Sequence, residues 1–281
     1  AYSLAGQISE AIGGITYLEA IRALSERVVS DWDSVRADLE ILRGLILNRQ
    51  DAILNLTADA GTLAAVQPYA AALGRALPTA FSVPLEREPL RAAANEALIV
   101  PAQVNYVGKG CNIYDLGYTW HGSAHVITRH LRMGWLWDQV RVQGGAYGAG
   151  LNTSETGRMV TYSYRDPSPA RTLGIDRSMS KGLRDFVAGD ERIDKYIIST
   201  VGESEPPLGS ENQILVSDEN LLCGITPEDL CRERAEMLST TKDALLTWCD
   251  VLDQMAKDGG VCVIGHDGAI AACEKEDLTV L

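Results

Sequence analysis

The sequence predicts an α+β fold, and three patterns support this prediction. Apolar residues recur every three to four positions through segments 15–47 and 123–137, which is the spacing of helices that bury one face. Apolar and polar residues alternate over 159–164, as in a strand with one buried face. With 281 residues, of which 46% are hydrophobic and 22% charged, the chain can bury a full core in one large or two modest domains.

The first part of the chain is predicted to be mainly helical. Two helices are expected within 15–47, and Ser30 is a plausible N-cap for the second. A short strand over 51–57 and an alanine-rich helix over 62–77 follow. Segment 79–95 contains two prolines and charges of both signs, so we place the linker between two units there.

Beyond the linker the sequence predicts strands and helices in alternation. The expected strands are two within 96–107, with Pro101 at an edge or bulge, then 159–164 and 262–265. The expected helices are 123–137, 171–187, 191–200 and two within 226–257. The acidic, proline-containing segment 202–220 is expected to be an exposed loop.

The most informative segment runs from Leu136 to Gly150, where an apolar run gives way to a glycine-dense turn. Four glycines in the seven residues 144–150 permit positive φ angles and the close approach of a second chain. Arg141 supplies a fixed cation and Tyr147 a phenolic donor, a combination suited to holding a peptide carbonyl. The alternative is structural: a helix C-terminus and a β-bulge, with Arg141 capping carbonyls and Tyr147 packed in a core.

Segment 137–148 closely resembles the C-terminal half of the presequence protease branch of the pitrilysin-type zinc metallopeptidases. Four further segments match in the family's order: GGITYL at 13–18, NYVGKG at 105–110, SYRDP at 163–167 and GITPE at 224–228. The resemblance implies mixed sheets with packed helices, divided into two domains. Residues 1–83 would be the remnant of the third family domain, which is incomplete because its earlier strands are absent, and residues 84–281 would be the last domain.

The resemblance also implies roles for individual residues. In this family two homologous halves close around a chamber, and the C-terminal half contributes an arginine and a tyrosine to it. On this chain these are Arg141 and Tyr147, which we expect to contact the substrate carbonyl and the transition state. Gly144, Gly145 and Lys109 are expected to bind substrate. Lys109 would lie at a tight glycine turn near the chamber, and the alternative is an exposed cation at that turn.

Zinc is expected to be held by the missing N-terminal half, because neither H-x-x-E-H nor H-E-x-x-H occurs in this chain. His121, His125 and His130 cluster in the sequence, but no Asp or Glu between Asp115 and Asp138 could complete a site with them. We therefore predict that this chain binds no metal and does not hydrolyse peptides alone. It also lacks a G-x-S-x-G nucleophile elbow and the Lys-Ser/Thr of a phosphate loop.

The net charge of −13 argues against binding to nucleic acids or anionic membranes and favours basic partners. No run approaches the roughly 18 to 20 consecutive apolar residues of a membrane span. The first six residues show no basic stretch, so we expect a targeting peptide to be absent or already removed.

The resemblance then implies the C-terminal, non-zinc-binding portion of a peptide-degrading zinc metalloendopeptidase. Its partners would be the N-terminal catalytic half and basic peptides, including cleaved targeting peptides and other short unstructured peptides. Its location would be the mitochondrial matrix or the chloroplast stroma. The alternative is a non-catalytic scaffold or peptide-binding subunit of the same fold, as in the processing-peptidase-like core subunits of respiratory complexes.

Overall fold

The computed structural model describes residues 4–50, 52–79, 95–273 and 276–280. The chain divides into two compact units. The helical unit comprises Ile8–Pro89 and Pro207–Thr226, and the C-terminal unit comprises Leu90–Pro206 and Pro227–Leu281 together with Ala1–Gln7. The predicted domain boundary between residues 83 and 84 lies outside the described residues, as does most of the predicted linker.

The C-terminal unit contains a six-stranded mixed sheet in the order β3-β4-β2-β5-β1-β6. The strands are β1 (Glu96–Ile99), β2 (Asn105–Asn112), β3 (Gly148–Thr153), β4 (Arg158–Asp166), β5 (Gly260–Gly265) and β6 (Thr279–Val280). Strand β2 is antiparallel to β4 and β5, whereas β1 is parallel to β5 and β6. The two strands expected within 96–107 are therefore separated by β5, and Pro101 lies in the connection between them.

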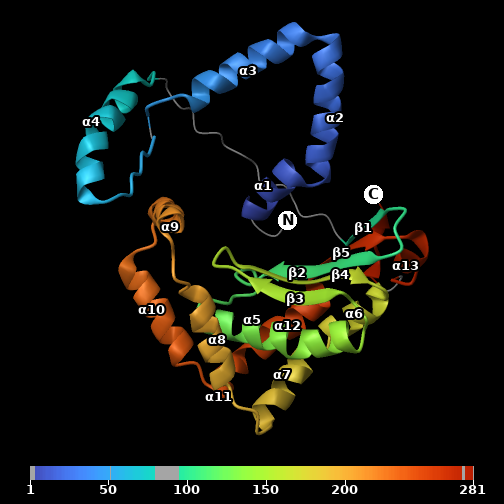
Figure 1. The fold of residues 1–281 in the computed structure, drawn as a ribbon. Coiled ribbons are helices and arrows are strands. Elements are labelled where there is room, and N and C mark those ends of the chain that lie inside the picture. Colours follow the sequence, from blue (N-terminus) through green and yellow to red (C-terminus); the bar gives the residue numbers. More distant parts are fainter. Residues whose placement is uncertain (1–3, 51, 80–94, 274–275, 281) are drawn as a thin grey trace. The chain divides into compact units, whose positions relative to one another are not determined.

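Helices α5, α6 and α12 lie against one face of this sheet, and α7 packs on α12 (Figure 1). The helices of the unit are α5 (Ser123–Met133), α6 (Pro169–Asp176), α7 (Met179–Ala188), α8 (Asp194–Ser204), α10 (Pro227–Leu238), α11 (Lys242–Leu245), α12 (Thr247–Asp258), α13 (Asp267–Ala271) and the π-helix η1 (Trp137–Val142). Their apolar sides bury residues such as Leu131, Leu183 and Trp248 against Leu151 and Met159 of the sheet. The helices that the sequence predicts in this unit thus form one layer over one face of the sheet.

Three helix predictions need correction. The helix expected over 123–137 ends at Met133, because Gly134 adopts φ −106° and ψ −91°, outside the helical region, and the π-helix η1 follows. The helix expected over 171–187 is divided into α6 and α7 at residues 177–178. The two helices expected within 226–257 are three, because Thr241 caps a separate short helix, α11, by accepting a hydrogen bond from the amide of Ala244.

The helical unit comprises α2 (Ile15–Ser30), α3 (Trp32–Ile46), α4 (Ala60–Ala76), α9 (Ser210–Cys223) and most of α1 (Leu4–Gly13). Asp31, rather than the predicted Ser30, caps α3: its carboxylate accepts a hydrogen bond from the amide of Ser34 at 3.2 Å. Ser30 is the last residue of α2, where its hydroxyl donates to the carbonyl of Glu26. Among the described residues of this unit, Val35 and Asn48 are buried.

Two further predictions in the helical unit are wrong. Residues 52–59 form no strand, although Asn55 within them donates a hydrogen bond to Asp218 of α9 at 2.8 Å. The loop expected over 202–220 contains the end of α8 and most of α9. Helix α9 ends at Gly224, whose φ of +69° is the left-handed conformation typical of a helix C-terminus. No helix within the described residues has the length and apolarity needed to cross a membrane.

Candidate functional site

The segment that contains Arg141 and Tyr147 folds as a π-helix, a tight turn and an edge strand. In η1 the amide of Gln143 donates to the carbonyl of Asp138 at 2.9 Å, a bond that spans five residues. Gly145 then adopts φ +80°, which reverses the chain into β3. A Cβ atom on Gly144 would lie 2.3 Å from the carbonyl oxygen of Val140, so this position requires glycine.

The turn brings Arg141 and Tyr147 together. The Nε atom of Arg141 donates to the backbone carbonyl of Tyr147 at 3.0 Å. The Arg141 guanidinium also stacks on the indole of Trp137, with its Cζ atom 3.9 Å from the ring centroid. No described residue accepts a hydrogen bond from the Nη atoms of Arg141. Two contacts therefore orient the guanidinium and leave its fork free for an acceptor outside the chain.

Tyr147 lies at the surface. Its side chain is 60% exposed, and no described residue shares a hydrogen bond with its hydroxyl. The ring lies 5.5 Å from that of Tyr164, and the Cζ atom of Arg165 lies 5.2 Å from the Tyr147 ring centroid. The alternative prediction of a Tyr147 packed in the core is wrong, although Arg141 does bond a carbonyl as that alternative required.

Tyrosines of the sheet extend this surface, and sequence reasoning missed them. Tyr106 of β2 is paired with Tyr164 of β4, and both are exposed on the face opposite the helices. Tyr164 lies over Gly148 of β3, where a Cβ atom would be 2.2 Å from the Tyr164 ring, and Tyr162 lies over Gly150 in the same way. Two features of the sequence could have indicated these tyrosines: Tyr162 and Tyr164 alternate with small polar residues in β4, and β3 begins with Gly-x-Gly. We call Tyr106, Tyr147, Tyr162 and Tyr164 the tyrosine face.

Lys109 lies in the middle of β2, so the predicted glycine turn at this position is wrong, as is the alternative of an exposed turn cation. Its side chain is 3% exposed, and its Nζ atom donates to the carbonyl of Ala256 in α12 at 2.8 Å. Burial lowers the pKa of Lys109. Because the side chain lies under α12, we leave Lys109 out of the binding surface proposed below.

The three clustered histidines point to separate partners. His121 pairs with the hydroxyl of Ser123 at 3.0 Å, and Nε2 of His125 lies 3.0 Å from Glu233. His130 packs in the core with Phe186 and Tyr196. Within the described ranges no group of three or more His, Cys, Asp or Glu side chains could hold a metal ion. That this chain binds no zinc remains a prediction.

Residues 95–267, more than half of the chain, match the family described as the PreP C-terminal domain. The chain belongs to this family. Presequence protease 1 of Arabidopsis thaliana, named chloroplastic/mitochondrial, is 37% identical over 280 residues, which are 98% of this chain and 25% of the relative. Protein HypA of Clostridium perfringens is 34% identical over 186 residues, 66% of this chain and 19% of the relative. This PreP C-terminal domain chain thus spans about a quarter or less of the length of these relatives.

Solved structures share the fold. The crystal structure of pitrilysin aligns with a TM-score of 0.52 at 11% identity, over 70% of this chain and 23% of that chain. A protease from Helicobacter pylori aligns with a TM-score of 0.52 at 10% identity, over 74% of this chain and 53% of that chain. The predicted family and the predicted α+β class, a mixed sheet with packed helices, are therefore confirmed.

Proposed function

We propose that this PreP C-terminal domain is the non-zinc-binding portion of a peptide-degrading zinc metalloendopeptidase, in which Arg141 and Tyr147 bind the substrate. The observation that supports this most strongly is the pairing of two free donors. The Arg141 fork and the Tyr147 hydroxyl lack partners among the described residues, while the bond from Arg141 Nε to the Tyr147 carbonyl holds the two residues together.

These donors suit a carbonyl oxygen that becomes negatively charged during hydrolysis. A preorganised donor is typically worth ~3 to 4 kcal/mol at such a transition state. Arg141 is preorganised because its guanidinium is already stacked on Trp137 and bonded at Nε. Gly144 and Gly145 would bind the peptide through their backbone. Gly145 is exposed and has no side chain, so a peptide can approach it closely, whereas the Val140 carbonyl and Arg171 fill the space beside Gly144.

Zinc, its ligands and the general base would come from the N-terminal catalytic half, since the described residues offer no fitting ligand set. We therefore assign no step at the metal to this chain and expect it to be inactive alone. Its charge of −13 favours basic peptides as substrates. The naming of the Arabidopsis relative supports a location in the mitochondrial matrix or the chloroplast stroma.

The test compares Arg141→Lys and Tyr147→Phe in the enzyme assembled with its catalytic half. Arg141→Lys loses the fork and Tyr147→Phe loses one free hydroxyl, so each should lower kcat/KM by roughly 10- to 1000-fold. Zinc content and melting temperature should stay at the parent values, because neither change removes a buried contact. Tyr106→Phe is the matched control: it removes a hydroxyl from the same tyrosine face and should leave kcat/KM unchanged.

Two results would contradict the proposal. Wild-type turnover in Tyr147→Phe would remove the role of that hydroxyl. Chelator-sensitive peptide cleavage by this chain alone would show that it contains its own metal site. The alternative of a non-catalytic scaffold predicts no zinc-dependent cleavage by the assembled protein at all.

A further inference from the structure

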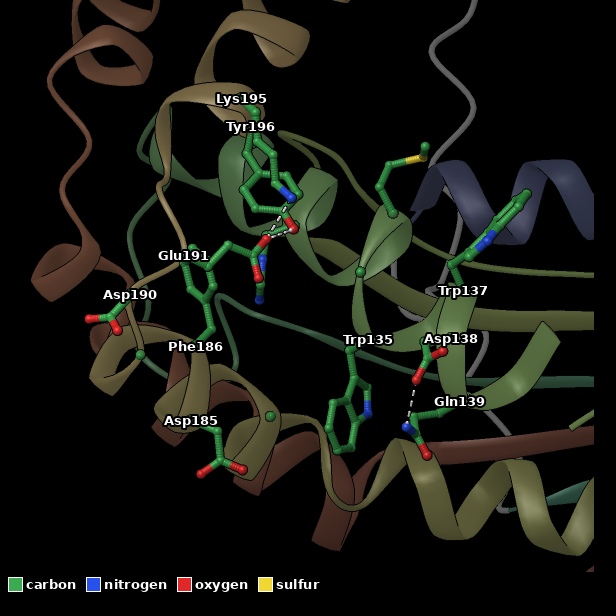
Figure 2. Close-up of a pocket in the computed structure, with 15 residues that line it drawn as sticks. Trp135, Trp137, Asp138, Gln139, Asp185, Phe186, Asp190, Glu191, Lys195 and Tyr196 are labelled. Carbon is green, nitrogen blue, oxygen red and sulfur yellow. Dashed lines mark hydrogen bonds and ion pairs between the residues drawn. The ribbon is translucent and has the colours of Figure 1, made fainter. Parts of the chain in front are cut away.

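A cavity of about 570 Å³ lies between the end of α5, η1, α7 and the start of α8, and it does not include Arg141 or Tyr147 (Figure 2). Four aromatic side chains line it: Trp135, Trp137, Phe186 and Tyr196. Four carboxylates also line it: Asp138, Asp185, Asp190 and Glu191. Lys195 and His130 also line it. The cavity therefore combines aromatic walls with an excess of negative charge.

The aromatic walls are held in place by the fold. Trp135 lies flat against α7, where a Cβ atom on Gly182 would come within 2.4 Å of the indole. On the other side His130 stacks with Phe186 at a centroid distance of 4.0 Å and meets Tyr196 edge-on at 4.8 Å. These rings lose little conformational entropy when a ligand binds, because packing already holds them in one conformation.

Two ammonium groups of the described residues lie beside this cavity: that of Lys195, and that of Lys242, which donates to the carbonyl of Gly189 and lies 4.9 Å from the centroid of the Phe186 ring. Glu191 accepts hydrogen bonds from the ammonium of Lys195 at 2.6 Å and from the hydroxyl of Tyr196 at 2.7 Å. The Nζ atom of Lys195 lies 4.8 Å from the centroid of the Tyr196 ring. Asp138 lies on the η1 side, and among the described side chains its carboxylate accepts hydrogen bonds only from the neutral amides of Gln139 and Gln143. Glu191 is thus paired with the ammonium of Lys195, and Asp185 with that of Lys181 at 3.7 Å, whereas no described cation pairs with Asp138.

Two polar atoms beside the cavity have no partner within the described structure. His130 is 5% exposed, and its Nδ1 atom makes no hydrogen bond. Burial lowers the pKa of His130 to about 4, so the ring is uncharged at neutral pH and retains one acceptor nitrogen. The indole Nε1 of Trp135 is a buried donor without an acceptor. Unpaired buried polar atoms are costly, so these two atoms give the cavity wall a polar character that the described residues do not satisfy.

We propose that this cavity binds the side chain of an arginine residue in a peptide. A guanidinium is planar, stacks on aromatic rings, donates to several carboxylates and is more weakly hydrated than an ammonium. The stacking of Arg141 on Trp137, at 3.9 Å, shows the same contact within the chain. This assignment does not depend on the proposed function of Arg141 and Tyr147.

The experiment titrates Nα-acetyl-arginine amide into the 281-residue chain, using calorimetry and the fluorescence of Trp135 and Trp137. The corresponding citrulline and lysine compounds are the comparison ligands, since citrulline keeps the shape of arginine without its charge. We expect the arginine compound to bind at least about tenfold more tightly than the citrulline compound, the effect of one charged hydrogen bond. The lysine compound should fall between the two.

Variants of the cavity carboxylates test whether the arginine compound binds in this cavity. Asp138→Asn and Glu191→Gln keep the shape of the cavity and remove one charge each, so each should weaken arginine binding by about threefold or more. Glu228→Gln is the matched control, because it removes one charge from the exposed first turn of α10, outside the cavity, and should change nothing. Circular dichroism confirms that each variant is folded.

Three outcomes would overturn the proposal: equal affinity for the arginine and citrulline compounds, no binding of the arginine compound at about 10 mM, or wild-type affinity in both folded variants. A lysine compound that binds as tightly as arginine would overturn the assignment to a guanidinium.

Discussion

Replacing Asp176 with asparagine should stabilise the C-terminal unit at neutral and alkaline pH. Asp176 ends α6 and is buried beneath the sheet. Its Oδ2 atom accepts a hydrogen bond from the hydroxyl of Thr161 at 3.0 Å, but its Oδ1 atom has no partner among the described residues. Burial raises the pKa of this carboxyl from 3.8 to about 7, an effect that the Thr161 hydrogen bond and the charge of Lys109 only partly offset.

The sign and size of the effect follow from proton linkage. The unfolded chain releases the Asp176 proton near pH 4, whereas the folded chain keeps it until about pH 7. Relative to the ionised carboxylate, the protonated Asp176 therefore stabilises the folded chain fully below pH 4. This contribution to the unfolding free energy is lost as pH rises from 4 to 7 and stays lost at higher pH. A pKa difference of about 3 corresponds to an upper limit of about 4 kcal/mol, or roughly 8 to 16 °C in melting temperature for a unit of this size.

The assay is thermal unfolding at pH 4.5 and pH 8.5 of the parent chain, Asp176→Asn and Asp115→Asn. Asparagine cannot ionise but keeps an oxygen toward Thr161, so Asp176→Asn should gain in melting temperature over the parent as pH rises. Asp115→Asn replaces an exposed carboxylate and controls for the loss of one charge. A difference between Asp176→Asn and the parent that does not change with pH would refute the reasoning, and so would a less stable variant at pH 8.5.

Two further predictions concern contacts near the candidate site and in the core. Gly145→Ala places a side chain on a backbone with φ +80° and should lower the unfolding free energy by about 1 kcal/mol in urea titrations. An unchanged unfolding free energy would contradict the positive φ of residue 145. Glu233 accepts hydrogen bonds from Trp120 at 2.9 Å and His125 at 3.0 Å, and the His125 bond lowers its pKa. Glu233→Gln should therefore lower the unfolding free energy, measured in urea titrations, by about 1 to 2 kcal/mol at pH 7. The loss should become smaller as pH falls through the range in which carboxylates take up protons, and a loss that does not change with pH would argue against an ionised Glu233.

The turn between Arg141 and Tyr147 could be predicted because its cause is local. A run of glycines indicates a reversal, and Gly145 does adopt a positive φ. Gly148 is different: it is a glycine because Tyr164 on the neighbouring strand lies over it. That requirement depends on the pairing of β3 with β4, so the alternation within β4 and the glycines of β3 indicate the tyrosine face only when the two segments are considered together.

Lys109 and segment 202–220 show how local composition misled the prediction. A lysine between two glycines is typical of a turn, yet Val107, Lys109 and Cys111 alternate as one buried side of β2. The acidic residues and prolines of 202–220 indicated a loop, yet its helix-forming residues continue to Cys223 in α9. In β2 the period of the segment described the structure better than its turn-forming residues did, and in α9 the helix-forming residues outweighed the acidic ones.

The π-helix η1 makes the position of Arg141 depend on the length of the chain before it. A π-helical turn holds one residue more than an α-helical turn, and one residue corresponds to a rotation of about 100° about the helix axis. Deleting a single residue within Trp137–Val142 would let the segment close as an α-helix and would turn Arg141 away from the Tyr147 carbonyl. A relative could thus keep the arginine, the tyrosine and every glycine, and still lose the paired donors through a one-residue gap that a count of identical positions would barely register.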